Sequence, residues 1–553
     1  SYFKEIFEMS TTTGSEVVHK NGNGNAGYSN RKWTLGVLSI ALIIIGLDIT
    51  VLNVAIPTLQ KELNASASGL QWIINSYILV FAGVLLTMGT LGDRFGRRLA
   101  FQAGLVIFGL ASVGAAFADS TSQLIIARAA QGIGGALIMP STLSVIVDVF
   151  PREERAKAIG IWAGVAAIGI PGGMIAGGWL LENFFWGSVF LLNVPVVIVA
   201  LLGSFVVIPE SRDPNAKTID WVGASFSMVS LSALIYAIIE APEKGWLSGV
   251  TLAGFAIFAV FAALFVWYEQ RQEHPMVDLK LFKNARLSAA VGSIGIAFMA
   301  MLGMMFMLTQ YLQFVQGYSP LDTGFRLVPM AMGFMVGAPT SAFLVGRLNS
   351  RTVMTVGMFL VAASVGSMAL LDVETTFWIT GSLIFAMGLG MANVMAPATD
   401  AVMAAVPESH AGVGSALNDT VRQIGGALGV GIFGSILSSI YTTNMSDAVS
   451  GLPQGLADAA SNQIGAALQV ADSLEGSAGG ELVVAAKNAF IDGTSIVYVI
   501  AGVVALIGTV LVWRFMPKYD LVAGSAEAER EIAASTGATG TAELATATVA
   551  IDE

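Results

Sequence analysis

The 553-residue chain contains no cysteine and only three histidines. It therefore forms no disulfide bonds and no thiolate metal sites. Charged residues are also scarce, at 12% of the chain against about 25% in an average soluble domain. The sequence holds no phosphate-binding glycine loop, metal-binding cluster or nucleophile–base triad. We therefore expect neither enzymatic catalysis nor a metal or other cofactor, and nothing in the composition points to a nucleic-acid partner.

Apolar residues make up 55% of the chain and gather in long unbroken runs. About 20 consecutive apolar residues span a bilayer as a helix. The sequence therefore predicts an all-α polytopic membrane protein. Hydropathy places fourteen transmembrane helices at residues 35–57, 70–91, 100–117, 123–147, 158–182, 188–208, 221–240, 249–268, 288–316, 324–346, 352–371, 377–403, 413–440 and 495–516.

The basic residues predict how these helices are oriented. Twenty-one Lys and Arg fall in the tails and loops of one side, and only Lys61, Lys244 and Lys487 fall on the other. Loops rich in Lys and Arg stay in the cytoplasm. We therefore expect both termini to be cytoplasmic.

The chain also repeats itself weakly. Residues 91–114 resemble 344–366, and residues 139–160 resemble 396–416. Both copies run in the same direction on the same side, which indicates parallel repeats of the kind found in secondary transporters.

The repeats predict two six-helix bundles with two inserted helices between them. We expect a cytoplasmic tail whose first eight residues, before Met9, are a remnant added to the natural chain, and a disordered cytoplasmic tail at the other end. The expected parts are a tail at 1–32, an N-terminal six-helix bundle at 33–208, an inserted two-helix segment at 209–287, a C-terminal six-helix bundle at 288–516 with an external loop at 442–494, and the final tail at 517–553.

The first predicted helix carries a single charge, Asp48. A charged side chain within the membrane costs about 2.5–3.5 kcal/mol on insertion scales, so it marks a functional site with a partner. Arg128 is embedded in the fourth helix. Counted at 1.5 Å per residue, Asp48 lies ~13 Å and Arg128 ~6 Å from the outer ends of their helices, which leaves pairing within reach. The alternative is that Arg128 reaches outward or binds backbone carbonyls.

Asp419 is a second embedded acid, in the thirteenth helix, and Arg422 follows three residues later on the same helical face. The two can therefore pair within the helix, which is the structural explanation. The functional explanation is a second proton or cation site.

The segment after the second helix reads GTLGDRFGRR. Its glycines permit a tight turn, and its aspartate can cap the next helix or pair with the arginines. The alternative is a plain basic loop. The residues singled out are Gly89, Asp93, Arg94, Gly96, Arg97 and Arg98.

The fifth helix carries a glycine stripe at Gly169, Gly173 and Gly177, with Pro171 inside it. Such a stripe lets another helix approach closely, and an internal proline kinks a helix. Two explanations of this segment stay open: a hinge, and simple tight packing.

Soft thioethers, aromatic faces and amides suit lipophilic cations. Residues of this kind are more often core or lipid-facing, and that explanation stays open for each of them. The candidate cavity residues are Trp72, Asn75, Tyr77, Met304, Gln310 and Tyr311.

In the external loop, apolar residues at helical spacing predict one or two amphipathic helices on the membrane surface.

Together the segments LDITVLNVAIP, GTLGDRFGRR and LIIARAAQGIGG and the glycine-rich fifth helix resemble the major facilitator superfamily, in particular its fourteen-helix drug:proton antiporters. The resemblance implies two rocking six-helix bundles that exchange an inward proton for outward lipophilic, mainly cationic compounds. It implies that Asp48 is the coupling carboxylate, that Arg128 tunes it, and that Asp93 with Arg97 latches a cytoplasmic gate. It also implies a monomer in the bacterial cytoplasmic membrane, in contact with lipid, powered by the proton gradient.

Two features depart from this branch. The usual Gly-Pro of the fifth helix is Gly173-Met174 here, with the proline three residues earlier, and the thirteenth helix has fewer acids. Fewer acids imply fewer protons per cycle or a narrower range of divalent cations. The rival functions are export of a lipid, siderophore or other metabolite, proton symport in the uptake direction, and a non-transporting membrane receptor.

Overall fold

The structure is a computed structural model that describes residues 29–63, 67–212, 220–272, 279–406, 411–474 and 477–517. Within these ranges every regular element is a helix and no strand occurs, which confirms the all-α prediction. The expected tails at 1–28 and 518–553 lie outside the described residues.

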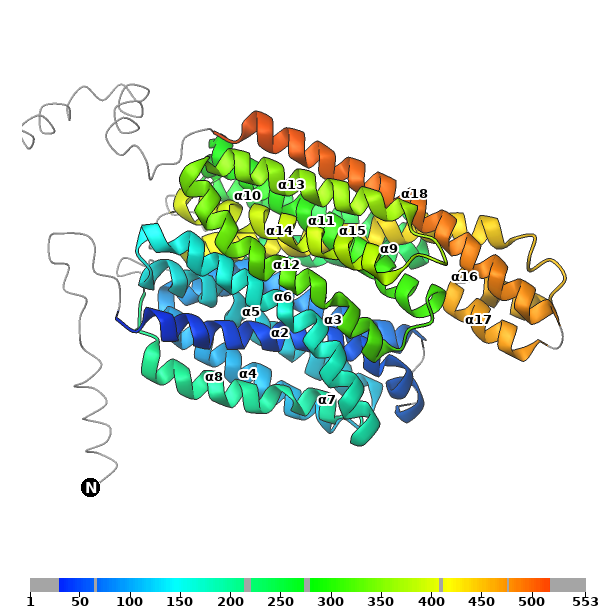
Figure 1. The fold of residues 1–553 in the computed structure, drawn as a ribbon. Helices are drawn as coiled ribbons and strands as arrows, with labels where there is room; N and C mark the ends of the chain where they lie inside the picture. Colours follow the sequence, from blue (N-terminus) through cyan, green and yellow to red (C-terminus); the bar gives the residue numbers. More distant parts are fainter. Residues whose placement is uncertain are drawn as a thin grey trace, which may run out of the picture.

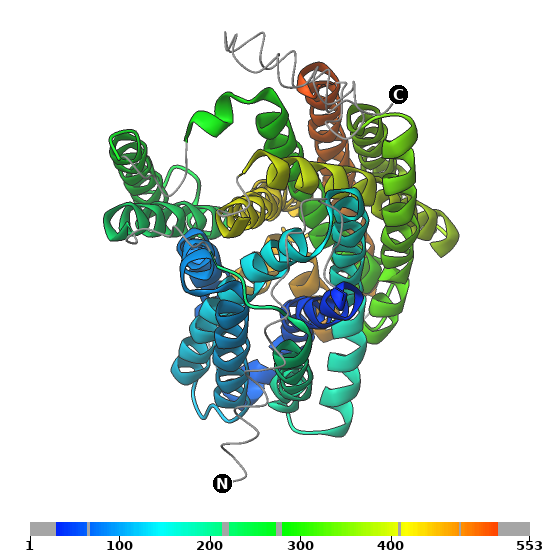
Figure 2. The ribbon, with the colours of Figure 1, turned by 90° about the vertical axis from the view of Figure 1, so that its left-hand side faces the viewer.

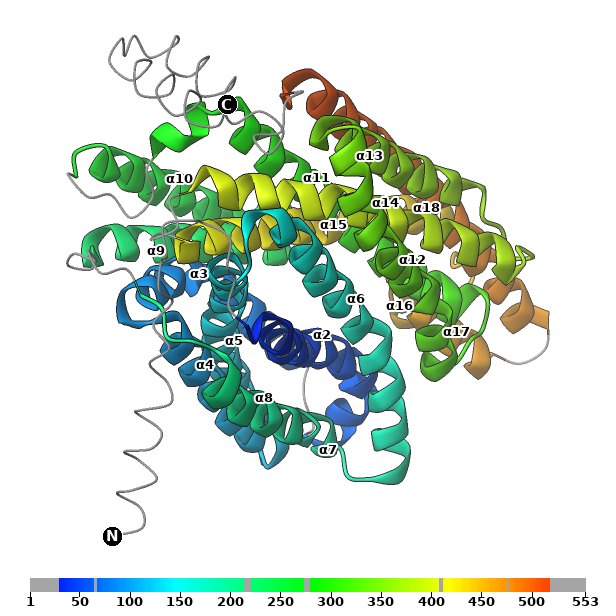
Figure 3. The same ribbon diagram turned by 60° about the vertical axis from the view of Figure 1, so that its left-hand side comes forward.

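The helices of the N-terminal half pack against one another. They are α2 (Arg31–Glu62), α3 (Ala67–Phe95), α4 (Arg97–Ala116), α5 (Thr121–Val149), α6 (Arg152–Asn183), α7 (Ser188–Leu191) and α8 (Asn193–Val207). Both α3 and α4 pack on α5, while α2 packs on α6 and α8. Figure 3 shows α2 surrounded by α5, α6 and α8.

A pair of helices, α9 (Trp221–Lys244) and α10 (Gly249–Glu269), follows the first half. They pack on each other, and α9 also contacts α3 and α15. Viewed along the helix axes, the pair stands at the flank of the bundle (Figure 2).

The C-terminal half has its own packed core. Its elements are η1 (Leu279–Lys283), α11 (Ala285–Gln310), η2 (Tyr311–Val315), α12 (Pro320–Arg347), α13 (Ser350–Ser367), η3 (Met368–Leu370), α14 (Phe377–Ala405), α15 (Ala411–Met445), α16 (Gln454–Asn462), α17 (Ile464–Ser473) and α18 (Ser477–Phe515). Here α12 packs on α14, α11 on α15 and α13 on α18. The two halves meet where α6 packs on α12 and α3 on α15.

Twelve helical segments of the described part are long and apolar enough to cross a membrane. With α2 and α6, which have 32 residues each, they correspond one to one to the predicted transmembrane helices. The total of fourteen membrane crossings stays a prediction. The start of α2 and the end of α18 lie at the same end of the bundle, as an even number of crossings requires (Figure 1).

The predicted external loop is largely helical. α15 and α18 extend into it, and α16 and α17 lie between them at the far end of the bundle (Figure 1). The prediction of one or two amphipathic helices there is confirmed. The prediction that their apolar faces lie on the membrane surface is wrong. Ala460, Ile464 and Ala467 are instead buried in the core shared with Leu482 and Ala486 of α18.

Candidate functional site

Asp48 of α2 lies inside the N-terminal half with its side chain only 1% exposed. Its Oδ2 accepts a hydrogen bond from Nη1 of Arg128, which is equally buried. Its Oδ1 accepts from Nε2 of Gln131 at 3.1 Å and from Nδ2 of Asn193 at 2.9 Å. A buried ion pair is tolerated only when the remaining polar positions are satisfied, and both carboxylate oxygens of this pair have donors.

The partners of Asp48 hold one another as well. Nε of Arg128 donates to the Ile73 carbonyl at 3.3 Å, so the arginine makes both contacts that the sequence left as alternatives. Oγ of Ser112 accepts from Gln131 at 2.8 Å and from Asn193 at 3.3 Å. We name Asp48, Arg128, Gln131, Asn193 and Ser112 the Asp48 network; it joins α2, α4, α5 and α8.

Sequence reasoning missed three members of this network. Gln131 lies three residues after Arg128 on the same helix face, a spacing that could have revealed it. Asn193 is a lone amide at the start of an apolar run. Ser112 carries no signal, because serines in membrane helices commonly bond a preceding carbonyl, as this one does with Phe108 at 2.8 Å.

Asp419 and Arg422 of α15 form the second buried charge pair, with Nη1 of Arg422 3.3 Å from Oδ1 of Asp419. Pairing within one helix, which the sequence left open beside a second proton or cation site, is present in this structure. Nδ2 of Asn418 lies 3.4 Å from the same oxygen, and Nη2 of Arg422 lies 3.4 Å from Oγ1 of Thr399 on α14. All these contacts are long, so the pair is loosely held.

The guanidinium of Arg422 also touches the opposite half. Its Cζ lies 4.8 Å from the ring centre of Trp162 on α6 and 5.4 Å from that of Phe298 on α11. Nε1 of Trp162 donates to Oγ1 of Thr142 at 3.1 Å, which fixes the indole. Arg422 therefore bridges the two halves deep in the bundle.

Asp93 connects the two halves at the predicted cytoplasmic end. Its carboxylate accepts backbone N–H bonds from Gly412 at 2.9 Å and from Val413 at 3.2 Å, and so caps the first turn of α15. Nε of Arg97 lies 3.1 Å from Asp93, and Nη1 of Arg97 lies 3.5 Å from Asp148. The carboxylate caps a helix of the other half, although the sequence pointed to the next helix along the chain.

Two glycines allow this close approach. A Cβ built on Gly89 would lie 2.5 Å from the Gly412 carbonyl oxygen, and one on Gly412 would lie 2.3 Å from the Gly89 carbonyl oxygen. Because the clashing atoms are backbone, no rotamer change relieves them. Gly89 is thus required by packing between halves.

The rest of the motif anchors the chain after α8. Gly96 has φ 117° and faces the Glu210 carboxylate. Nη1 of Arg98 donates to the Ile208 carbonyl at 3.3 Å, and partial burial raises the pKa of the Glu210 carboxyl. Arg94 stacks on Phe95, with Cζ 5.5 Å from the ring centre.

The glycine stripe of α6 packs against α2. A Cβ on Gly169 would lie 3.0 Å from Cα of Gly46, and one on Gly177 would lie 3.3 Å from Cα of Val51. Gly173 is buried in the same helix, and α6 is continuous across Pro171. The side chain of Pro171 lies outside the described part of the structure. The tight-packing explanation therefore has direct support, and a hinge stays a prediction.

The candidate cavity residues scatter. Tyr77 is buried, with its ring centre 4.6 Å from Cζ of Arg128. Met304 is fully buried and Tyr311 donates to the Asp372 carbonyl at 2.7 Å within the C-terminal core, so both belong to the packed interior in this conformation. Trp72 stacks on Tyr236 of α9 at 6.1 Å.

The remaining two candidates show little. Asn75 is half-buried, and Gln310 contacts its own helix through the Phe306 carbonyl at 3.3 Å. In this conformation Met304 and Tyr311 are packed in the core, the alternative that the sequence had left open, and a role in lining a cavity stays a prediction.

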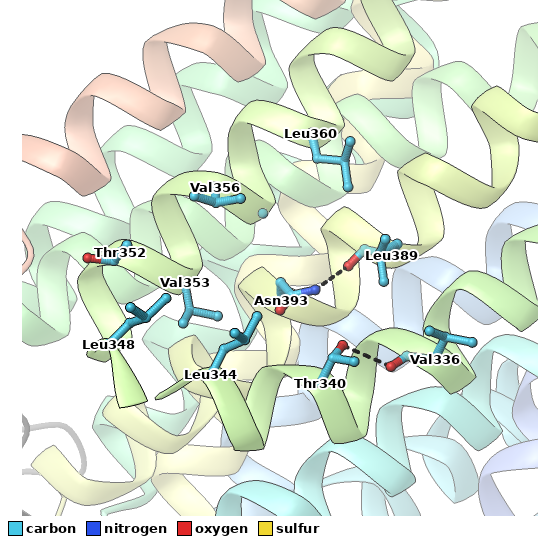
Figure 4. A pocket seen from close by; sticks show the side chains of 11 residues that line it. Val336, Thr340, Leu344, Leu348, Thr352, Val353, Val356, Leu360, Leu389 and Asn393 are labelled. Carbon is cyan, nitrogen blue, oxygen red and sulfur yellow. Dashed lines mark hydrogen bonds between the residues drawn. The ribbon is translucent and has the colours of Figure 1, made fainter. Parts of the chain in front are cut away.

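A cavity of about 350 Å³ lies elsewhere, on the flank formed by α12, α13 and α14. Its lining is apolar apart from Thr340, Thr352 and Asn393, and includes none of the residues singled out from the sequence. Figure 4 shows the amide nitrogen of Asn393 directed at Leu389, its hydrogen-bond partner at 2.8 Å. Val356 at its rim is 60% exposed, which makes this a lateral crevice.

Comparison with known proteins identifies relatives over most of the chain. Residues 38–430 match the model of the Major Facilitator Superfamily. The chain is 35% identical to the tetracenomycin C resistance and export protein of Streptomyces glaucescens, across 90% of this chain and 94% of that protein. It is 35% identical to the methyl viologen resistance protein SmvA of Salmonella typhimurium, across 88% and 99%.

Two further comparisons agree. The multidrug efflux pump LfrA of Mycolicibacterium smegmatis is 34% identical across 87% of this chain and 96% of that protein. The crystal structure of the human organic anion transporter MFSD10 shares the fold, with a TM-score of 0.56 at 12% identity, covering 87% and 99% of the two chains. The family match over residues 38–430 and the relatives of 35% identity establish that the chain belongs to the Major Facilitator Superfamily.

Proposed function

We propose that this protein is a proton-coupled antiporter that exports lipophilic, mainly cationic compounds across the cytoplasmic membrane by alternating access. The observation that carries the proposal is the fully buried Asp48–Arg128 pair within the membrane-spanning part. A membrane protein keeps such a charge where protons or substrates need it. The names of the relatives, which speak of drug resistance and export, support the direction of transport.

The proton step works through the Asp48 network. Protonation of Asp48 would cancel its charge and weaken its pairing with Arg128, which sits on a different helix. α2 also packs on α6, and α6 contacts α12 of the other half. A change in the charge of Asp48 therefore acts on a helix that lies at the interface between halves, which is how a local event can bias a two-state transition.

The gate works through Asp93. In this conformation the carboxylate ties α3 to the start of α15, so the predicted cytoplasmic end is closed. Opening that end requires Asp93 to release the N–H groups of Gly412 and Val413. Asp93 and Arg97 are thus the latch, and Asp419 with Arg422 is a second coupling site.

The wider proposal is a monomer in a bacterial cytoplasmic membrane, in contact with lipid, with both termini in the cytoplasm. Transport proceeds without catalysis, and its energy comes from the proton gradient, with no cofactor.

The test is efflux of ethidium from cells that lack their own pumps. Cells that express the protein should accumulate less ethidium than control cells, and a protonophore or Asp48→Asn should abolish the difference. Asp119→Asn is the matched control, because Asp119 is exposed in the turn between α4 and α5. Efflux that survives both the protonophore and Asp48→Asn would contradict proton coupling.

A second candidate is export of a neutral lipid or lipophilic metabolite. The apolar crevice on α12–α14 favours it, since its one buried amide offers no charge to a cation. A panel of cationic and neutral compounds in the same cells separates the two.

A further inference from the structure

The guanidinium of Arg422 is a cation held between two aromatic rings from opposite halves. Trp162 comes from α6 and Phe298 from α11, and both ring centres lie within 6 Å of Cζ. That distance defines a cation–π contact, which strengthens away from water. The Arg422 side chain is only 9% exposed, so these contacts are desolvated.

The carboxylate beside the rings is incompletely used. Asp419 meets Arg422 at 3.3 Å through Oδ1, whereas its Oδ2 is buried without a hydrogen-bond partner among the described residues. Nε of Arg422 is also buried and without a hydrogen-bond partner in the described part of the chain. A half-satisfied buried ion pair is costly. Oδ2 of Asp419 can therefore still accept a contact from a cation, beyond the contact that Oδ1 makes with Arg422.

The cluster also lies within the predicted membrane-spanning part of both halves. Trp162 is ten residues from the start of α6 and Arg422 eleven from the start of α15. Counted at 1.5 Å per residue from the starts of the predicted membrane segments, at 158 and 413, Trp162 lies about 6 Å and Arg422 about 14 Å inside a hydrocarbon core of about 30 Å.

We propose that Trp162, Phe298 and Asp419 form a binding site for a monovalent organic cation, and that Arg422 occupies this site as a built-in competitor while the cytoplasmic end is closed. A lipophilic cation binds when Arg422 turns away, toward Oγ1 of Thr399, which already lies 3.4 Å from its Nη2. Two aromatic faces and one carboxylate suit one delocalised positive charge. The proposal rests on the proposed function for its substrate class.

The test is equilibrium binding of tetraphenylphosphonium to the purified full-length protein in detergent, without a proton gradient. Arg422→Gln removes the competing charge and should tighten binding about tenfold, the ratio expected for one desolvated cation–π partner. Arg422→Lys keeps the charge and should bind like the wild type. Binding by Arg422→Gln that is equal to or weaker than that of the wild type would overturn the proposal.

The aromatic part of the site has its own variants. In the Arg422→Gln protein, Trp162→Leu should weaken binding about tenfold, while Trp162→Phe, which retains a ring, should keep most of it. If Arg422→Gln does not fold, Trp162→Leu alone decides. It should weaken binding of tetraphenylphosphonium but not of neutral triphenylphosphine oxide, and an equal loss for both would overturn a cation site.

The outcomes are distinct from those of the proposed function. These measurements involve no flux, so an absence of proton coupling leaves them unchanged. Conversely, coupled export with unaltered binding in every variant would contradict this inference alone.

Discussion

Asp48 receives its three donors from side chains on two helices, and the arginine is the one that carries charge. Removing that charge leaves a buried carboxylate with amide partners only. Breaking a buried ion pair from one side commonly costs 3–5 kcal/mol. The arginine should therefore matter to the stability of the N-terminal half as well as to transport.

We expect Arg128→Leu to lower the free energy of unfolding by about 3–5 kcal/mol. Adding Asp48→Asn should recover much of that loss, since no uncompensated charge remains. Denaturation of both variants and of the double variant in detergent measures the coupling between the two sites. Additive losses, with no recovery in the double variant, would show that the two side chains do not stabilise each other.

At the same scale, the sequence identified the charges but not their neutral partners. Asp48, Arg128 and Asp419 stand out because charge is rare in apolar helices. Gln131, Asn193 and Trp162 do not, because amides and indoles occur in membrane helices for many reasons. Their roles depend on which helices lie side by side. Trp162 and Arg422, for example, are in contact although they lie 260 positions apart in the sequence.

At the scale of elements, the closed end depends on the contact between α3 and α15. Asp93 supplies the cap of α15, and such a cap contributes about 0.5–2 kcal/mol. Asp93→Asn keeps an oxygen acceptor but loses the ion pair with Arg97. The change should favour opening of this end over the closed form.

The chain has no cysteine, so a single introduced thiol reports this opening. Ala416 is fully buried on α15 beside Gly89. We expect maleimide to label Ala416→Cys slowly, and at least several-fold faster once Asp93→Asn is added. Equal labelling rates would mean that Asp93 does not hold the end closed.

Gly89→Ala should act in the same direction, because its Cβ would lie 2.5 Å from a backbone oxygen of Gly412. It should raise the labelling rate of Ala416→Cys and lower transport. Gly114→Ala is the matched control: this glycine is also helical but has nothing within 4 Å of an added Cβ. There alanine should leave both readings unchanged, with at most a small gain from helix propensity. Equal effects of the two changes would exclude close packing as the reason for Gly89.

The glycine-rich segments also show the limit of sequence reasoning about elements. The stripe on α6 correctly indicated close helix packing, because small residues are needed wherever backbones touch. The partner, α2, was not predictable from the stripe itself. Likewise the periodicity of the external segment gave its helices, while the core that α16 and α17 share with α18 is a tertiary arrangement.

At the scale of the whole molecule, hydropathy and the repeats predicted the helical architecture because a membrane allows few alternatives to apolar helices. The structure has two packed halves, which meet where α3 packs on α15 and α6 packs on α12. The sequence could not give the conformation, because open and closed ends use the same residues in different contacts. In this structure the Asp93 cap joins the two halves at the predicted cytoplasmic end, and Arg422 contacts Trp162 of the other half.

The central claim is that substrate export is exchanged for protons at Asp48. The most direct test uses purified protein in proteoliposomes with a pH-sensitive dye inside and an imposed proton gradient. Addition of ethidium should trigger proton movement with the wild-type protein and none with Asp48→Asn, although the variant should still fold. Normal ethidium-dependent proton movement by well-folded Asp48→Asn would contradict the account.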